Sequence, residues 1–169
     1  MKRYVIIFAL TCFIAFLNGC DKGITPEPEA LPKEAGFGGS IIFKGNWPQG
    51  VTRTHIVAFR TPLLSSKDFN ILNLAFVSDS IPYGTRQIVY SSLINPIVPI
   101  KNGDYAYLAV AQSKTPALSL ERKDWYIIGV YYINNDTTKP GTLNIPENTF
   151  IPDINITCDF NDPPSQPPF

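Results

Sequence analysis

Alternating apolar and polar residues divide the middle of the chain into short extended segments. Alternation with a period of two is typical of a β-strand that buries one face. In the segment 54–60, His55, Val57 and Phe59 would share one side of such a strand. The pattern predicts seven strands or extended segments, at 40–44, 54–60, 86–93, 95–100, 105–112, 124–133 and 154–160.

Two of these segments, 105–112 and 124–133, are apolar on both faces. The pair Asn102-Gly103 stands between 95–100 and 105–112, and both of its residues tolerate positive φ. The sequence therefore predicts a β-hairpin that joins 95–100 to 105–112.

The segment 65–76 fits two structures. Asp68 is placed to cap a short helix in which Phe69, Leu72 and Phe76 follow at helical spacing. Alternation over 71–76 fits a strand equally well. We favour a loop with one or two helical turns.

Short strands separated by turn residues, without alternating helices, predict an all-β fold. We expect a single antiparallel β-sandwich of about seven strands over residues 39–160, either transthyretin-like or immunoglobulin-like. Residues 20–38 are polar and proline-rich, as expected of an extended tether. Four of the nine residues in 161–169 are proline, and we expect this tail to be disordered.

The N-terminus carries a targeting pattern. Lys2 and Arg3 precede an uncharged apolar run at 4–16, which is shorter than the roughly 20 residues of a spanning helix. The following Leu-Asn-Gly-Cys sequence, ending at Cys20, resembles the bacterial lipobox. The resemblance implies that a signal peptide, 1–19, is removed and that Cys20 is acylated. We therefore expect a membrane-anchored extracytoplasmic protein, in the outer membrane and periplasm or on the cell surface.

A second resemblance lies in the body of the chain. The segments 39–45 and 98–110 resemble the glycine-led first strand and the proline, turn, glycine and aromatic-strand pattern of transthyretin-like domains, including the regulatory domains of carboxypeptidases. The resemblance implies a seven-stranded sandwich with a non-catalytic accessory or anchoring role. It implies no particular functional residue.

Net charge bears on the class of partner, and the positions of the cysteines indicate their roles. Without residues 1–19 the chain has a net charge near −2, which does not favour a nucleic-acid partner. Of the three cysteines, Cys12 lies in the signal peptide and Cys20 is expected to carry lipid. Cys158 alternates with polar neighbours, and we expect it to be a buried apolar residue.

Catalytic chemistry has little support in the sequence. His55 is the only histidine, and no serine or cysteine lies in a nucleophile-elbow context. Clustered metal ligands are absent from the sequence. We expect no enzymatic activity, no cofactor and no metal. The alternative is a small envelope hydrolase, which would use His55 as its base.

Aromatic residues are the remaining candidates for binding. We single out Trp47, Trp125 and Tyr131, from a set that comprises Trp47, Tyr105, Tyr107, Trp125, Tyr126, Tyr131 and Tyr132. Most lie in doubly apolar strands and are expected to fill the core. A carbohydrate-binding accessory domain is the alternative, if several are coplanar and exposed. We thus expect a lipid-anchored envelope protein with a non-catalytic binding or structural domain, whose partner is an envelope protein or a glycan.

Overall fold

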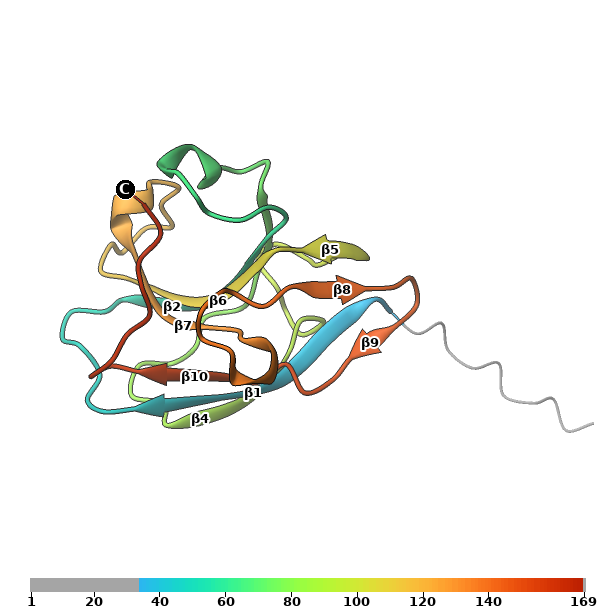
Figure 1. Ribbon diagram of the computed structural model, residues 1–169. Helices are drawn as coiled ribbons and strands as arrows, with labels where there is room; N and C mark the ends of the chain where they lie inside the picture. The colour runs from blue at the N-terminus through green and yellow to red at the C-terminus, as the bar shows by residue number, and fades with distance from the viewer. Residues whose placement is uncertain (1–33, 169) are drawn as a thin grey trace, which may run out of the picture. The chain divides into compact units, whose positions relative to one another are not determined.

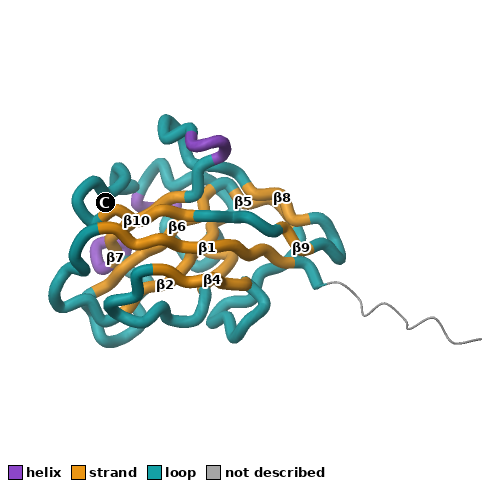
Figure 2. Tube along the Cα trace, turned by 90° about the horizontal axis from the view of Figure 1, so that it is seen from below, coloured by secondary structure: helices purple, strands orange, loops and turns teal. Residues whose placement is uncertain are grey.

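The computed structural model describes residues 34–168, which are called the body below (Figure 1). The signal peptide 1–19, the acylation site Cys20 and most of the tether 20–38 lie outside the described residues. The body is mostly β, and the only helical elements described are three-residue 3₁₀ turns (Figure 2). Its strands are β1 Gly36–Lys44, β2 Arg53–Phe59, β3 Leu74–Val77, β4 Gln87–Ser91, β5 Gly103–Tyr105, β6 Tyr107–Ser113, β7 Trp125–Val130, β8 Leu143–Ile145, β9 Phe150–Ile151 and β10 Ile156–Asp159.

The strands form two four-stranded sheets and one small ribbon. The first sheet has the order β10-β1-β4, with β9 also paired to β1. The second sheet has the order β3-β2-β6-β7, and β5 pairs with β8 in the ribbon. Both large sheets contribute side chains to one apolar cluster, which includes Phe37 and Ile41 from the first sheet and Leu108 from the second. This cluster is the main core.

The central strands of the second sheet are buried on both faces, as the doubly apolar pattern of 105–112 predicts. The second sheet also carries its own apolar cluster on the face turned away from the main core. The side chains directed into the main core are Ile56, Ala58, Leu108 and Val110, and those on the opposite face are Val57, Phe59, Ala109 and Ala111. The alternation predicted for 54–60 is thus confirmed.

Most strand pairings are antiparallel, and the predicted all-β fold class is confirmed. Two pairings are parallel: β1 lies beside β10, with Phe43 opposite Cys158, and β1 also lies beside β9. Parallel neighbours need a long connection between them, and here almost the whole body separates β1 from β10. Local sequence patterns carry no signal for such a pairing.

The hairpin predicted at Asn102-Gly103 is wrong. Gly103 has positive φ, as that turn requires, but β5 continues from it and pairs with β8. The segment 95–100 instead meets β3 through the bridge between Val77 and Val98. Residues 65–76 combine both alternatives, a 3₁₀ turn at Ser66–Asp68 followed by the start of β3.

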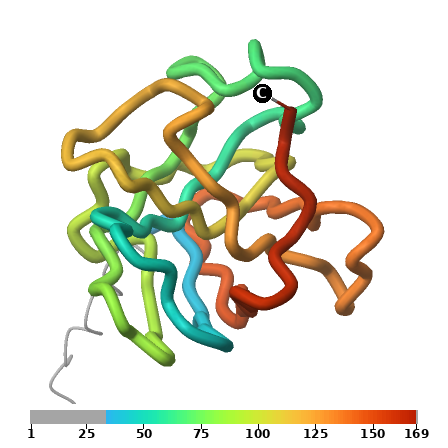
Figure 3. Tube along the Cα trace, turned by 90° about the vertical axis from the view of Figure 1, so that its left-hand side faces the viewer, coloured from blue at the N-terminus to red at the C-terminus, as the bar shows by residue number. Residues whose placement is uncertain are grey.

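The C-terminal segment differs from the expected disordered tail. Residues 161–168 run from the end of β10 back along β7 (Figures 1 and 3). The Gln166 side chain is hydrogen-bonded to the backbone of Ile127, and Arg122 donates to the carbonyl of Pro167. Proline content indicated disorder, whereas these side-chain contacts hold the segment in place.

Candidate functional site

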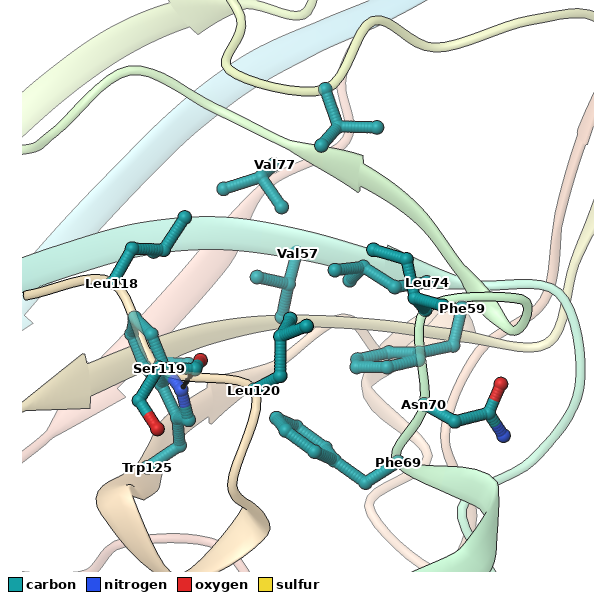
Figure 4. A pocket seen from close by; sticks show the side chains of 13 residues that line it. Val57, Phe59, Phe69, Asn70, Leu74, Val77, Leu118, Ser119, Leu120 and Trp125 are labelled. Carbon is teal, nitrogen blue, oxygen red and sulfur yellow. Dashed lines mark hydrogen bonds between the residues drawn. The ribbon is translucent and has the colours of Figure 1, made fainter.

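An apolar pocket of about 80 Å³ lies on the outer face of the second sheet (Figure 4). Strands β2, β3, β6 and β7 form its floor, and the segments 69–71 and 118–120 form its walls. Its lining residues are Val57, Phe59, Phe69, Asn70, Ile71, Leu74, Val77, Val98, Ala111, Leu118, Ser119, Leu120 and Trp125. Only two of these side chains, Asn70 and Ser119, are polar.

Hydrogen bonds hold the first wall in shape. The carboxylate of Asp68 accepts from the backbone amides of Leu64 and Ser65 at 3.0 and 2.7 Å, and from the Ser65 hydroxyl at 3.0 Å. These bonds favour the ionised carboxylate and hold the pKa of Asp68 below its ordinary value. These bonds fix the turn that leads into the wall.

Asn73 ties the far end of the same wall to the end of β2. Its side chain is buried, donates to the carbonyl of Asp68 at 2.8 Å and accepts from the amide of Thr61, also at 2.8 Å. Buried polar groups are stable only when hydrogen-bonded, and Asn73 meets that condition. Phe69, next to this network, is packed against Phe59 with ring centroids 5.5 Å apart.

Trp125 holds the second wall. Its indole N–H donates to the carbonyl of Ser119 at 2.8 Å, and the Ser119 hydroxyl bonds the Asp124 carboxylate. The amide of Glu121 also donates to that hydroxyl, at 3.0 Å. One face of the Trp125 ring system is thereby fixed as a pocket wall (Figure 4).

Exposed apolar side chains surround the pocket. Leu118, Leu120 and Ile71 line it while remaining 46%, 55% and 58% exposed. Leu72, beside Ile71, is 87% exposed. Grouped exposed apolar residues of this kind mark interaction sites on soluble domains.

The pocket is suited to binding an apolar group. Carboxylates, ammonium groups, imidazoles and thiols do not occur among its lining residues. The one hydroxyl in the lining belongs to Ser119, and it is bonded to the Asp124 carboxylate. The pocket volume is below the roughly 150 Å³ of an apolar cavity that holds benzene, so it matches a single aliphatic side chain better than a larger ring system.

The three aromatic residues singled out from the sequence do not come together. Trp125 is 6% exposed in the outer cluster, whereas Trp47 is half-buried beside Phe43 and donates its indole N–H to the Thr85 carbonyl. Tyr131 packs against the main core. They share no flat exposed platform, and Trp125 is chiefly a core residue that also forms a pocket wall.

Among the described residues, neither His55 nor Cys158 is part of the pocket lining. His55 is fully buried, and desolvation lowers the pKa of its imidazole. Its Nδ1 is 3.0 Å from the carbonyl oxygen of Ser78, so the ring is bonded to backbone rather than to a nucleophile. Cys158 is fully buried as expected, and desolvation raises the pKa of its thiol.

The described residues contain neither a clustered metal site nor a membrane-spanning helix. Residues 34–168 contain no group of three or more histidine, cysteine or acidic side chains placed to hold a metal ion. Within the same part of the chain, no helix has the length and apolar character to cross a membrane. Comparisons with protein families, curated proteins and solved structures find no match for this chain.

The sequence contained a signal for the pocket that its strand pattern did not reveal. Leu118 and Leu120 fall between the predicted strands 105–112 and 124–133, and Ile71 and Leu72 fall in the segment that fits either a helical turn or a strand. Apolar residues in two segments that had not been assigned to a strand were the available sign of an apolar surface.

Proposed function

We propose that this protein is a lipid-anchored component of the bacterial cell envelope whose body is a non-catalytic binding module. The N-terminal pattern ending at Cys20 supports the anchor. The two large sheets that share one core support a β-sandwich. The resemblance to transthyretin-like domains included a hairpin between 95–100 and 105–112, and this hairpin is not formed, because 95–100 meets β3. The proposal therefore keeps only the sandwich and the accessory role from that resemblance.

The apolar pocket carries the proposal of binding. Anchor side chains that fill well-packed apolar pockets contribute most of the binding energy in protein interfaces. The pocket between Phe69 and Trp125 is preformed, uncharged and the size of one aliphatic side chain. A protein partner that inserts a leucine, isoleucine or valine fits it better than a sugar, which needs polar groups to bind its hydroxyls.

Site-specific photo-crosslinking in the native host tests the proposal. A benzoylphenylalanine at Leu120 should form a discrete adduct with one envelope protein. The matched control is the same probe at Val89, which is 79% exposed on β4 of the other sheet and should form no such adduct. Adding Ile71→Glu to the Leu120 probe should abolish the adduct, because a carboxylate in the pocket lining opposes apolar docking.

Three outcomes would contradict the proposal. Equal adducts from positions 120 and 89 would indicate non-specific contact. A glycan adduct would favour the carbohydrate-binding alternative over a protein partner. A Leu120 probe without any adduct, in a variant that folds and localises normally, would exclude the pocket as the binding site.

A further inference from the structure

The outer edge of β7 presents backbone groups that another chain can bind. β7 is the last strand of the second sheet, with β6 on its other side. Edge strands carry unpaired N–H and C=O groups that act as templates for further pairing. At Ile127 both groups are bound by the C-terminal segment of this chain.

A side chain, and not a backbone, makes this pairing. The carboxamide of Gln166 accepts from the Ile127 amide at 2.9 Å and donates to the Ile127 carbonyl at 2.8 Å. One donor and one acceptor in this arrangement reproduce what a neighbouring strand residue supplies. A side chain takes the place of a backbone here because proline has no N–H, and Pro164 and Pro167 lie close to Gln166 on either side.

Further contacts hold the segment around the glutamine. Arg122 is 7% exposed, and its guanidinium donates to the carbonyl of Pro167 at 2.8 Å and also to the carbonyl of Trp125. Pro167 is itself buried. The Gln166 amide nitrogen donates to the carbonyl of Pro164 at 3.0 Å, which fixes the side chain relative to its own backbone.

We propose that the β7 edge, with Ile127 and Arg122, is a binding site for proline-rich extended peptides that contain a glutamine. The chain's own residues 161–168 occupy this site in cis. In this site, the backbone N–H and C=O of Ile127 form hydrogen bonds with the glutamine carboxamide, and Arg122 donates to a neighbouring backbone carbonyl. Extended proline-rich segments suit such recognition because little conformational entropy is lost when they bind. Ile127, Gln166 and Pro167 do not line the apolar pocket, so the inference stands apart from the proposed function.

Peptide binding to a truncated chain tests the site directly. The probe is a fluorescent synthetic peptide of residues 161–169, measured by anisotropy against the full chain and against a chain ending at Phe160. Because a tethered segment competes at high effective concentration, the truncated chain should bind the peptide at least about tenfold more tightly. A peptide with Gln166→Leu should lose binding, and the control peptide with Ser165→Ala should keep it.

A second readout uses the full chain in case the truncated chain does not fold. Gln166→Leu removes both bonds to Ile127, so hydrogen exchange of the Ile127 amide should accelerate by at least about tenfold. The Val110 amide in the interior strand β6 should keep its wild-type rate, and Ser165→Ala should change neither amide.

The results that overturn the proposal are distinct from those that bear on the apolar pocket. Equal peptide binding by the full and truncated chains would place the peptide elsewhere. Absence of binding to a folded truncated chain would refute the site, as would unchanged Ile127 exchange in Gln166→Leu. A Leu120 crosslink is expected to persist in Gln166→Leu, because the pocket and the β7 edge use different residues.

Discussion

His55 shows how burial decides the chemistry of a single residue. Its Nδ1 lies against the Ser78 carbonyl, which only accepts, so Nδ1 carries the proton of the neutral ring. Nε2 is buried without a hydrogen-bond partner among the described residues. Protonation of Nε2 would create a buried charge and a donor without an acceptor. The residue is therefore held neutral, which suits packing beside Trp125 and not proton transfer.

This neutral state predicts how stability depends on pH. The pKa of His55 is lower in the folded chain than its ordinary value of 6.5, so below about pH 6.5 the unfolded chain binds the extra proton. Stability should consequently fall as pH decreases, with a slope approaching about 1.4 kcal/mol per pH unit for this one proton. Nearby charges act in both directions, since Arg53 lowers the pKa and Asp79 raises it.

Urea unfolding of wild type and His55→Gln between pH 5 and 7.5 measures this effect. The variant should be less stable at pH 7.5 but should show a flatter pH dependence. The pKa values of the exposed carboxylates Asp68 and Asp136 are lowered, so their contribution to stability is lost only near and below pH 4. These two groups therefore do not titrate between pH 5 and 7.5. Parallel pH profiles for the two proteins would show that His55 is not the group that titrates.

At the level of elements, β7 packs directly against β10 of the other sheet at Gly129. A Cβ built on Gly129 would lie 2.5 Å from the Cys158 sulfur and 2.9 Å from Cγ2 of Ile156. Close approach of two strands requires a residue without a side chain at that point. Gly129 is thus required by packing and not by backbone angles.

The contact between Gly129 and Cys158 predicts a coupled pair of substitutions. Gly129→Ala should destabilise the body by about 1–3 kcal/mol, because the added methyl group overpacks the contact. Cys158→Ala removes the nearest atom, so the double variant should lose less stability than the sum of the two single variants. Urea midpoints of the four proteins give the coupling energy. Strictly additive losses would mean that the two sheets do not meet at this point.

The same elements show what the sequence could and could not predict. Strands such as 54–60 follow from alternation, because one period-two pattern fixes both faces of the strand. The parallel pairing of β1 with β10 and the short ribbon β5-β8 depend on contacts between distant residues, which no local pattern encodes. The pocket escaped prediction for the same reason, since segments around Phe69 and Leu120 meet only in the fold.

On the scale of the whole body, both proposed binding sites belong to the second sheet. Its outer face carries the apolar pocket between Phe69 and Trp125, and its edge strand β7 carries the C-terminal segment. Trp125 connects them structurally, because its indole N–H holds the Ser119 wall and its carbonyl accepts from Arg122. Substitution of Trp125 would remove the indole that holds the pocket wall but keep the carbonyl that Arg122 binds, and Leu120 and Gln166 report on each site separately.

Lipid attachment at Cys20 is the remaining prediction, and it determines where these surfaces act. A thiol directly after Leu-Asn-Gly at the end of an apolar run is the expected acceptor of an acyl chain. Cells grown with radiolabelled palmitate should incorporate label into the wild-type chain and into Cys158→Ser, but not into Cys20→Ser. Wild-type protein should fractionate with membranes, and Cys20→Ser should lose this association, because acyl chains supply the membrane affinity. Equal labelling of wild type and Cys20→Ser, or release of wild type as soluble protein, would refute the anchor and leave the two binding sites to be tested on an unanchored protein.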